Sequence, residues 1–334
     1  MSNRIDLIQT EEMLRRADDI IILTHRYPDG DTLGSSYALC RILRGLGKTA
    51  HVRCPDPIPA RYEFLRGDDD DADETHIKNA GFIVAADVAS PHMLGPLETE
   101  YAGRVDLCID HHESNAFYAA HTFVDTSAAA VGEIIYDLWQ KMDPGQNRDT
   151  AHIADCLFTS ITTDTGCFRY RSVTPRTHEI AAGLLHMGAD GGAINRAIFE
   201  TKTRSRMRVE QEVLSTLRFY DGDAVAVITL SRAALRKTGA DEGDLDGLSA
   251  IPRRIEGVKA GVFLRETSGG WKLSMRTAPE FNASEICARL GGGGHPAAAG
   301  AALQGDLPAV TAAVLDAIHQ SSSENETSAP ETSG

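Results

Sequence analysis

The chain of 334 residues is too long for one small module and long enough for two domains that each bury a core. Hydrophobic residues make up 42% and charged residues 24% of it, an ordinary globular composition that excludes a wholly disordered or collagen-like chain. The formal net charge of −15 argues against a protein that coats duplex nucleic acid, because such a protein neutralises many phosphates with Lys and Arg. This charge does not by itself decide whether a small phosphate-bearing substrate is bound.

The beginning of the chain and its cysteines are typical of a cytoplasmic protein. The first residues, MSNRIDLIQTEEM, lack the apolar core of a signal peptide. Apolar runs stay far shorter than the ~20 residues of a membrane helix. The six cysteines are scattered without a C-x-x-C pair, which is the pattern of reduced thiols. We therefore expect a cytoplasmic protein that does not contact a membrane.

The first half of the chain alternates strand-sized apolar runs with helical patterns. Strands are expected at residues 19–24, 49–53, 81–86 and 105–109, and helices at 32–46, 127–142, 149–162 and 175–187. Fully apolar strands that alternate with helices form a parallel sheet covered on both faces. The sequence therefore predicts an α/β first domain over residues 1–188, with a parallel sheet between two layers of helices.

The second half predicts a helical linker and a smaller α+β domain. Residues 189–220 read as two helices, and their basic stretch 202–208 is interpreted as a solvated linker face rather than a nucleic-acid track. Strands at 224–230, 258–265 and 271–276, with helices at 231–236, 282–290 and 307–319, predict a second domain over residues 221–320. Residues 321–334, rich in Ser, Glu and Thr, are expected to be disordered. The acidic run at 68–74 is expected to be a solvated loop.

Acidic and imidazole side chains follow the ends of the predicted strands, where ligands of open parallel sheets bind. The first such segment contains His25, Asp29 and Asp31. Two carboxylates on either side of a glycine can point at two adjacent ions. The alternative for this segment alone is structural, with Asp29 in a turn and Asp31 capping the helix that follows.

Two further segments repeat this pattern, and a third places an acidic residue after a predicted helix. Asp87 directly follows strand 81–86, and the tripeptide Asp110-His111-His112 follows strand 105–109. Two adjacent imidazoles are hard to explain by packing alone, because every buried ring nitrogen needs a partner. Asp164 lies in the polar turn TDTG after a predicted helix, where a capping role is the alternative.

Taken together, these residues form a ligand set of imidazole nitrogens and carboxylate oxygens without thiolates: His25, Asp29, Asp31, Asp87, His111 and Asp164. Such a set suits two divalent ions better than a structural zinc, with Mn²⁺ favoured by the imidazoles and Mg²⁺ as the alternative. Two ions that share a carboxylate can activate a water to hydroxide for attack on phosphorus. The set therefore indicates hydrolysis of a phosphoester.

The same segments resemble the motifs of a known family. HRYPDGD at 25–31, Asp87, DHH at 110–112 and TDTG at 163–166 resemble, in order, the four motifs of the DHH phosphoesterase superfamily, and GGGGHPAAAG at 291–300 resembles the signature of its associated C-terminal domain. The resemblance implies these roles: one metal on His25 and Asp29, the other on Asp31, His111 and Asp164, Asp87 as the bridge, Asp110 as the carboxylate that orients a histidine ligand, and His112 facing the substrate phosphate.

The resemblance also implies phosphate contacts in the second domain. Consecutive glycines free backbone N–H groups to bind an anion, so we expect Gly292, Gly293, Gly294 and His295 to contact phosphate. The alternative is that Gly291 is a helix C-cap, but four glycines followed by a histidine exceed what a cap needs. Arg276 is expected to make a charge-assisted contact to phosphate, and Arg169 is a weaker prediction of the same kind. Such a site would lie between the domains.

Chain length and domain content narrow the expected substrate. The resemblance is to short stand-alone members, the bifunctional oligoribonucleases (nanoRNases) that also convert adenosine 3′,5′-bisphosphate (pAp) to AMP and phosphate. A cyclic di-AMP or pApA phosphodiesterase is the alternative, and a non-catalytic nucleotide sensor is the alternative of a different class. Expected partners are short oligoribonucleotides or small nucleotides, and a homodimer stays open beside a monomer.

Overall fold

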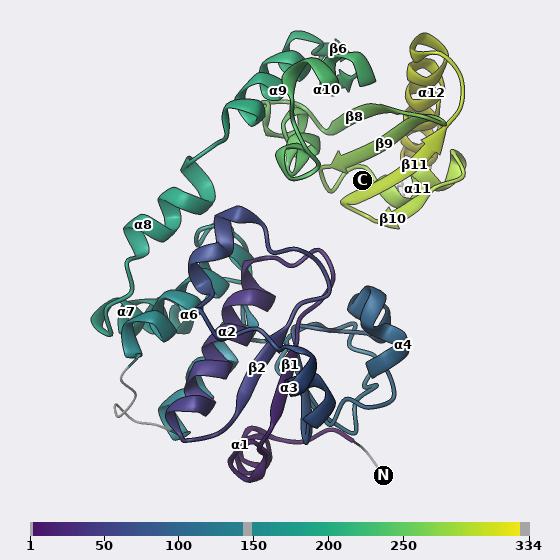
Figure 1. Cartoon of the computed structure of the whole chain (residues 1–334). Helices are drawn as coiled ribbons and strands as arrows, with labels where there is room; N and C mark the ends of the chain where they lie inside the picture. The colour runs from purple at the N-terminus through teal and green to yellow at the C-terminus, as the bar shows by residue number, and fades with distance from the viewer. Residues whose placement is uncertain (1–2, 143–148, 328–334) are drawn as a thin grey trace. The chain divides into compact units, whose positions relative to one another are not determined.

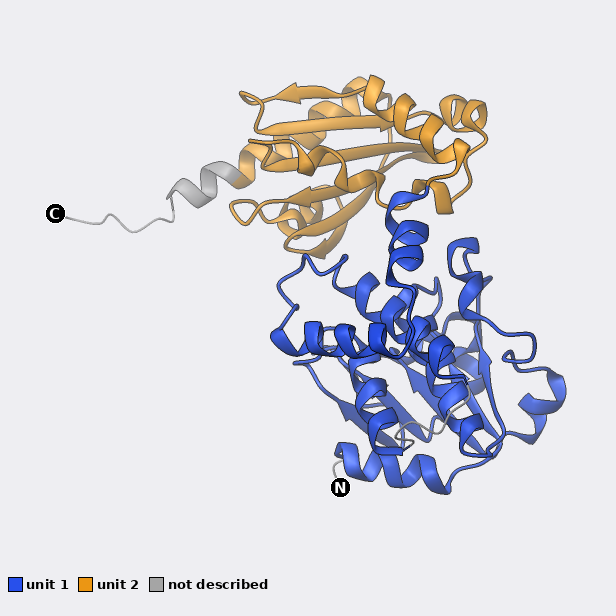
Figure 2. Cartoon of the chain, turned by 90° about the vertical axis from the view of Figure 1, so that its left-hand side faces the viewer, with its two compact units in different colours: residues 1–201 blue, residues 202–334 orange. Residues whose placement is uncertain are grey.

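The chain divides into two compact units, Met1–Thr201 and Lys202–Gly334 (Figure 2). The computed structural model describes residues 3–142 and 149–327. The boundary between the units falls inside the segment expected to be a linker, so that α8 (Gly191–Asn195) belongs to the first unit and α9 (Arg204–Ser215) to the second.

Unit 1 is built on a five-stranded parallel sheet of order β2-β1-β3-β4-β5. Its strands are β1 (Ile20–Leu23), β2 (Ala50–Arg53), β3 (Phe82–Ala86), β4 (Leu107–Asp110) and β5 (His121–Val124). The α/β prediction is confirmed, and four strands fall where the apolar runs placed them. The edge strand β5 was not predicted, because its sequence HTFV begins with an exposed histidine and alternates in burial.

Side chains of successive strand residues pack into two separate cores, one on each face of this sheet. Ile20 and Ile22 of β1 contribute to a core with α2 (Gly30–Gly45), α5 (Val131–Met142) and α6 (Thr150–Asp164). Ile21 and Leu23 point the other way, into a core with the 3₁₀ segment η2 (Pro91–Leu97) and α4 (Glu98–Tyr101). The run of β-branched residues is thus buried on both sides, as a central parallel strand requires.

The remaining helical elements of unit 1 lie around these layers (Figure 1). They are α1 (Leu7–Arg16), η1 (Ala60–Leu65), α3 (Glu74–Asn79), α7 (Pro175–His186), α8 and the π-helix η3 (Arg196–Glu200). α7 begins with Pro175 in its first turn and is capped by Thr174, as its sequence predicted.

Strand order places the predicted motifs next to one another. β1 pairs with both β2 and β3, so the direction in which strands are added reverses at β1. Ligands of doubly wound sheets bind at such a switch point, beyond the carboxyl ends of the strands. Residues directly after β1 and β3, and the end of the neighbouring β4, therefore meet at one edge of the sheet.

The acidic residues of the run 68–74 are exposed as expected except Asp70. Asp70 is buried and pairs with Arg41 and Arg44, which reach it from α2. Asp71 accepts a hydrogen bond from the buried Tyr37, and Asp73 caps α3. Asp70 departs from the expected solvated loop, because cations on α2 compensate the charge that its burial would otherwise penalise.

Unit 2 contains a six-stranded mixed sheet of order β10-β11-β9-β8-β7-β6. Its strands are β6 (Arg218–Tyr220), β7 (Val225–Leu230), β8 (Ala260–Thr267), β9 (Gly270–Thr277), β10 (Gly293–His295) and β11 (Ala298–Leu303). Only β7 and β8 pair in parallel; the other neighbours are antiparallel. β10 and β11 were not predicted, because Gly and Ala have low strand propensity and these strands are made largely of them.

Helices cover the two faces of this second sheet unequally. α11 (Ala283–Arg289) and α12 (Leu307–Thr327) pack on one face. The other face is covered over β7 and β8 by α9, by α10 (Arg232–Thr238) and by three short 3₁₀ segments, η4 (Gly243–Leu245), η5 (Leu248–Ala250) and η6 (Pro252–Arg254). α12 continues to Thr327, so the disorder expected from Ser321 is wrong for the first part of the tail, where the helix simply propagates; residues 328–334 lie outside the described residues.

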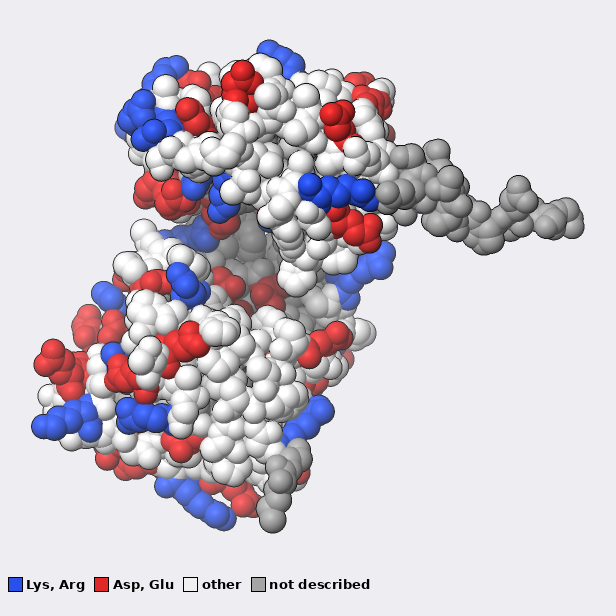
Figure 3. All heavy atoms as spheres, turned by 90° about the vertical axis from the view of Figure 1, so that its right-hand side faces the viewer, with Lys and Arg blue, Asp and Glu red and all other residues white. Residues whose placement is uncertain are grey.

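The surface carries both signs of charge. On the face shown in Figure 3, Lys and Arg lie among Asp and Glu over both units, without a continuous basic track. Within the described residues, no helix combines the length and apolar character needed to cross a bilayer.

Candidate active site

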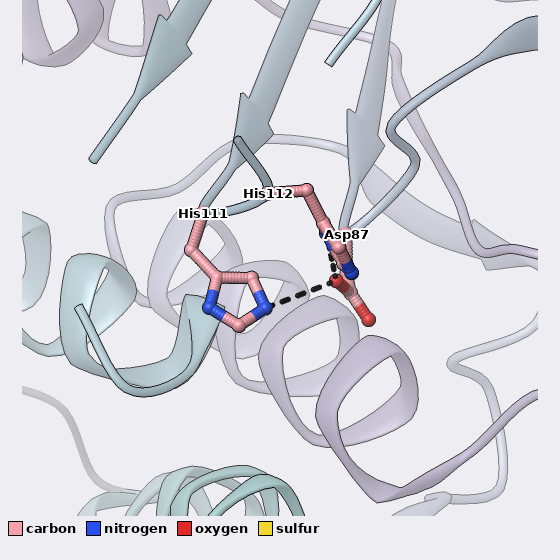
Figure 4. Close-up of side chains that lie close together, drawn as sticks. All are labelled: Asp87, His111 and His112. Carbon is pink, nitrogen blue, oxygen red and sulfur yellow. Dashed lines mark ion pairs between the residues drawn. The ribbon is translucent and has the colours of Figure 1, made fainter. Parts of the chain in front are cut away.

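Three polar segments meet beyond the ends of β1, β3 and β4. His111 and His112 follow β4 and point towards Asp87, which follows the neighbouring β3 (Figure 4). Nε2 of His25 lies 3.5 Å from Oδ1 of Asp29 and 3.5 Å from Oδ2 of Asp87. The switch point therefore holds a cluster of imidazoles and carboxylates.

A second group of ligand-type atoms surrounds His111. Its Nε2 lies 3.7 Å from Oδ2 of Asp31, 3.8 Å from Oδ1 of Asp87 and 3.4 Å from Oδ2 of Asp164. Each group, His25–Asp29–Asp87 and Asp31–His111–Asp164, has its donor atoms within 4.8 Å of one another. The structure thus brings together all six residues that were predicted to bind metal.

Hydrogen bonds orient the two histidine rings for metal binding. Nδ1 of His25 lies 2.7 Å from the carbonyl of Arg26, and Nδ1 of His111 lies 3.1 Å from the carbonyl of Ala128. A carbonyl can only accept, so each Nδ1 carries a proton, and each Nε2 is the nitrogen left to bind a cation once it is deprotonated. This arrangement is common for histidines that bind metal.

Asp87 lies between the two groups and has the features of a bridging carboxylate. Its Oδ2 faces His25 and its Oδ1 faces His111. The residue is 3% exposed, and its Oδ1 accepts no hydrogen bond from any described residue. Its φ of 62° lies in the left-handed region, which is strained for a non-glycine residue and is found mostly at functional sites. A buried carboxylate oxygen with no hydrogen-bond donor fits coordination to a cation.

Backbone N–H groups hold both carboxylates of the segment Asp29-Gly30-Asp31. Asp29 caps α2 and accepts hydrogen bonds from the N–H groups of Asp31 and Thr32. The alternative that placed Asp31 as the cap is wrong, because α2 begins at Gly30. Asp31 is fully buried and instead accepts the N–H of Val131 at the start of α5, where the helix dipole stabilises a negative charge.

Without a cation, this cluster concentrates negative charge in a buried site. Burial, and next the charge of Asp31, hold the pKa of Asp87 well above its usual range. Burial and Asp31 also raise the pKa of Asp164 to about 7. Burial opposes the charged form of His25, but Asp29 and Asp87 outweigh it and raise the pKa of that imidazole to about 11. The site is therefore one in which bound cations relieve repulsion among carboxylates.

Asp110 orients His112 rather than the ring of the neighbouring His111. Its Oδ1 lies 2.8 Å from Nδ1 of His112, and its Oδ2 accepts a 2.6 Å hydrogen bond from Asn115. Its contact with His111 is only to the backbone N–H. That Asp110 orients a histidine ligand stays a prediction, because the ring it holds, His112, belongs to a third group that could hold a metal ion, Asp87–His111–His112. This hydrogen bond raises the pKa of His112 to about 9.

The four consecutive glycines at 291–294 in unit 2 have different structural roles. The N–H of Gly292 bonds to the carbonyl of Cys287 and that of Gly291 to Ala288, a Schellman cap that ends α11 with Gly291 at a φ of 77°. A Cβ at Gly292 would lie 2.1 Å from the carbonyl oxygen of Gly300, so close strand packing excludes a side chain there. Of these four, only Gly293 meets two conditions: an added Cβ would have no atom within 4 Å, and its φ lies outside the left-handed region.

The strand register puts two of the predicted phosphate contacts on one face of the second sheet. His295 pairs with Ala298, and Ala298 pairs with Arg276 on the next strand. Residues opposite one another across antiparallel strands share a face, so His295 and Arg276 flank a small alanine. Arg169 lies in unit 1, exposed, with its Nε donating to the carbonyl of Gly166. Phosphate binding by these residues stays a prediction.

Comparison with known proteins identifies the family. A family model described as "DHH family, N-terminal domain" matches residues 19–161, and a "DHHA1 domain" model matches residues 222–321. A bifunctional oligoribonuclease and PAP phosphatase NrnA of Thermus thermophilus is 36% identical over 303 residues, covering 90% of this chain and 89% of that protein. The chain belongs to the DHH family. It is a phosphoric ester hydrolase, and the resemblance drawn from its motifs is confirmed.

Other DHH relatives extend the comparison. The NrnA of Bacillus subtilis is 25% identical over 90% of this chain and 93% of its own. A cyclic-di-AMP phosphodiesterase PdeA of Listeria monocytogenes is 24% identical over 85% of this chain but only 45% of its own length. The crystal structure of an exopolyphosphatase-related protein from Bacteroides fragilis matches with a TM-score of 0.86 and 26% identity, covering 96% of this chain and 97% of that one.

The sequence analysis missed two residues of unit 1 at the site, Asn115 and Ser160. Asn115 is buried and holds Asp110 from the side opposite His112. Ser160 on α6 donates its hydroxyl to Oδ1 of Asp31. Neither follows a strand end, so the rule that found the ligands could not find them. For Asn115 the only local signal is its position three residues after the DHH tripeptide.

Proposed function

We propose that this DHH protein hydrolyses short oligoribonucleotides to 5′-mononucleotides and removes the 3′-phosphate of pAp, using two divalent ions, Mn²⁺ in preference to Mg²⁺. The observation that carries the proposal is the position of Asp87, whose two oxygens face one ligand group each. The names of the Thermus and Bacillus relatives support this pair of substrates.

The residues present fit the two ions. His25 and Asp29 would hold one, Asp31, His111 and Asp164 the other, and Asp87 both. When bound, the ions supply Lewis acidity and a water of lowered pKa. The chain itself contributes fixed ligand geometry, because the histidine rings and Asp31 are held by backbone groups before any metal binds.

His112 would act on the substrate. Asp110 holds its Nδ1, which leaves Nε2 free on a side chain that is only half-buried. With its pKa raised to about 9, the ring is protonated at neutral pH. A protonated Nε2 can stabilise charge on the phosphoryl oxygens or give a proton to the leaving oxygen.

The decisive experiment compares products from pAp, pApA, a five-nucleotide RNA and cyclic di-AMP with the purified chain and Mn²⁺. We expect AMP and phosphate from pAp and mononucleotides from the two linear substrates. The variants Asp87→Ala and His112→Ala should lose this turnover. Wild-type protein that leaves pAp and both linear substrates intact would refute the proposal.

The same assay separates the alternatives. Cleavage of cyclic di-AMP in preference to pAp would favour the activity named for the Listeria relative. Tight nucleotide binding without turnover would indicate a sensor. The complete ligand set argues against a sensor, because a binding module has no need to keep all six metal-binding side chains.

A further inference from the structure

Tyr27 is an exposed aromatic side chain inside the first metal-binding motif. It is 73% exposed, and its φ of 52° is unfavourable for a non-glycine residue. Two contacts fix this conformation: the N–H of Tyr27 donates to the carboxylate of Asp56, and the N–H of Arg26 donates to the carbonyl of Met93. The chain therefore holds this tyrosine outside the protein, where it buries little surface.

Arg26 supports one side of the Tyr27 ring. Its guanidinium carbon lies 4.4 Å from the ring centroid, and its Nη2 donates a 2.6 Å hydrogen bond to the tyrosine hydroxyl. A ring that is covered on one side and exposed on the rest offers a flat surface to another planar group. Nucleobases stack on such aromatic surfaces regardless of their sequence.

Tyr170 is a second exposed tyrosine, next to the fourth motif. It is 59% exposed. Its ring lies on Gly166, where a Cβ would be 2.4 Å from Tyr170 Cζ, so only glycine fits beneath it. The turn that carries it is left-handed at three successive residues, Gly166, Cys167 and Phe168. Phe168 anchors the turn by packing on Phe158 and His178.

The two tyrosines adjoin different ligand groups. Tyr27 stands between His25 and Asp29, and its Cα is at most about 7.6 Å from theirs, because consecutive Cα atoms are 3.8 Å apart. Gly166, under the ring of Tyr170, is equally near Asp164 of the other group. Each tyrosine is therefore close along the chain to one ligand group, and the nucleosides on the two sides of a phosphodiester bound between the groups would lie beside these groups.

We propose that Tyr27 and Tyr170 are stacking platforms for the two nucleobases that flank the scissile phosphate. The inference rests on the proposed function and adds what the ligand set does not supply, a preference for nucleotides over other phosphoesters. Both tyrosines belong to unit 1, so the inference needs no contact with the second unit.

The test is a thermodynamic cycle with Mn²⁺-loaded full-length protein. Substrates are pApA and two analogues in which the 5′ or the 3′ adenine is replaced by hydrogen. Tyr27→Ala and Tyr170→Ala should each raise KM for pApA by about 5- to 100-fold, the range expected for one lost stack, with little change in kcat. On the analogue that lacks the base stacked by the mutated tyrosine, each variant should show the same KM as wild type. Tyr27→Phe and Tyr170→Phe should retain wild-type KM.

Controls separate failure of this inference from failure of the proposed function. Phe219→Ala removes an exposed aromatic ring, 43% exposed, from the edge strand β6 and should leave KM unchanged. Unaltered Mn²⁺ binding in both Tyr→Ala variants shows that the ligands are in place. If wild type cleaves pApA but the Tyr→Ala variants keep its KM, or lose the same factor on intact and base-free substrates, the tyrosines do not stack on bases. If wild type cleaves nothing, the proposed function falls and the inference with it.

Discussion

Asp110 and His112 form a hydrogen-bonded pair in which Oδ1 of the fully buried carboxylate lies 2.8 Å from Nδ1 of the ring. The pair raises the pKa of His112 to about 9, so a function that needs the protonated ring persists below that pH and is lost as pH rises through it. In Asp110→Asn the pKa of His112 falls towards its ordinary value of about 6.5. We expect kcat on pAp to drop about 10- to 100-fold at pH 8.

The pH profile distinguishes this role from general damage. With metal saturating at each pH, the descending limb of kcat should move to lower pH in Asp110→Asn. His112→Ala should remove that limb altogether. Asn115→Ala, which removes only the second hydrogen bond to Asp110, should leave the limb in place or move it slightly to higher pH, because the Asp110 charge is then shared with His112 alone. A descending limb that stays in place in both Asp110→Asn and His112→Ala would show that His112 is not the titrating acid.

The fold and the grouping of the candidate ligands were predictable because both depend on local sequence. Apolar strands identify the sheet, and residues directly after β1, β3 and β4 must meet at its edge, which is enough to find His25, Asp87 and His111. The direction in which a histidine ring points is not decided by the local sequence alone. Two adjacent histidines look alike in sequence, and only the turn after β4 decides that His111 faces the carboxylate cluster while His112 turns to Asp110.

Other errors have the same origin in tertiary contacts. Composition made Asp70 a loop residue, but Arg41 and Arg44 on α2 bury it. Gly and Ala predicted no strands at β10 and β11, yet β11 pairs with β9, and β10 pairs with β11. Contacts with Arg41 and with β9, which lie far away in sequence, override what local composition and strand propensity predict.

Asp87 should matter for the metal-bound protein and not for the metal-free one. Burial and the charge of Asp31 make its ionised form unfavourable without cations, so Asp87→Asn should leave the metal-free Tm unchanged or raise it. The rise in Tm that Mn²⁺ produces should be largely lost, because binding stabilises only in proportion to affinity. Thermal unfolding with and without Mn²⁺ measures both effects.

Asp29→Ala is the matched comparison. Asp29 also caps α2, so its loss should destabilise the metal-free protein by about 1 kcal/mol in addition to weakening Mn²⁺ binding. If metal-free Asp87→Asn unfolds at a clearly lower temperature than wild type, burial and the charge of Asp31 do not disfavour the ionised form of Asp87.

Metal affinity should fall at acid pH. The pKa of Asp164 is raised to about 7 by burial and by Asp31, so a proton competes with the cation below that pH. The apparent affinity for Mn²⁺ should decrease by at least about tenfold for each pH unit below 7. Calorimetric titration between pH 6 and 8, in two buffers of different ionisation enthalpy, gives the affinity and the protons released. Asp164→Asn should bind more weakly and with a shallower pH dependence; an unchanged slope would remove Asp164 from the ligand set.

The Arg41–Asp70 ion pair should contribute strongly to stability. Both side chains are only 5% exposed, so Asp70→Ala leaves a buried guanidinium that keeps its ion pair with Asp149 but loses this partner. Loss of one member of a buried pair costs about 3–5 kcal/mol, whereas Asp69→Ala, at the exposed neighbouring position, should change stability by less than about 0.5 kcal/mol. Urea denaturation of both variants measures the difference. Equal stabilities would mean that Asp70 is solvated after all.

Substitutions at two adjacent positions distinguish strand packing from phosphate contact in the glycine run 291–294. Gly292→Ala drives a Cβ to within 2.1 Å of the Gly300 carbonyl, so the strand must shift and unfolding should become easier by about 1–3 kcal/mol. Gly293→Ala meets no atom within 4 Å and should leave stability nearly unchanged. If the exposed backbone at Gly293 contacts phosphate, the added methyl group should raise KM for pAp while the Tm stays that of wild type. A Gly293→Ala protein with wild-type KM on both pAp and pApA would assign the whole run to capping and strand packing.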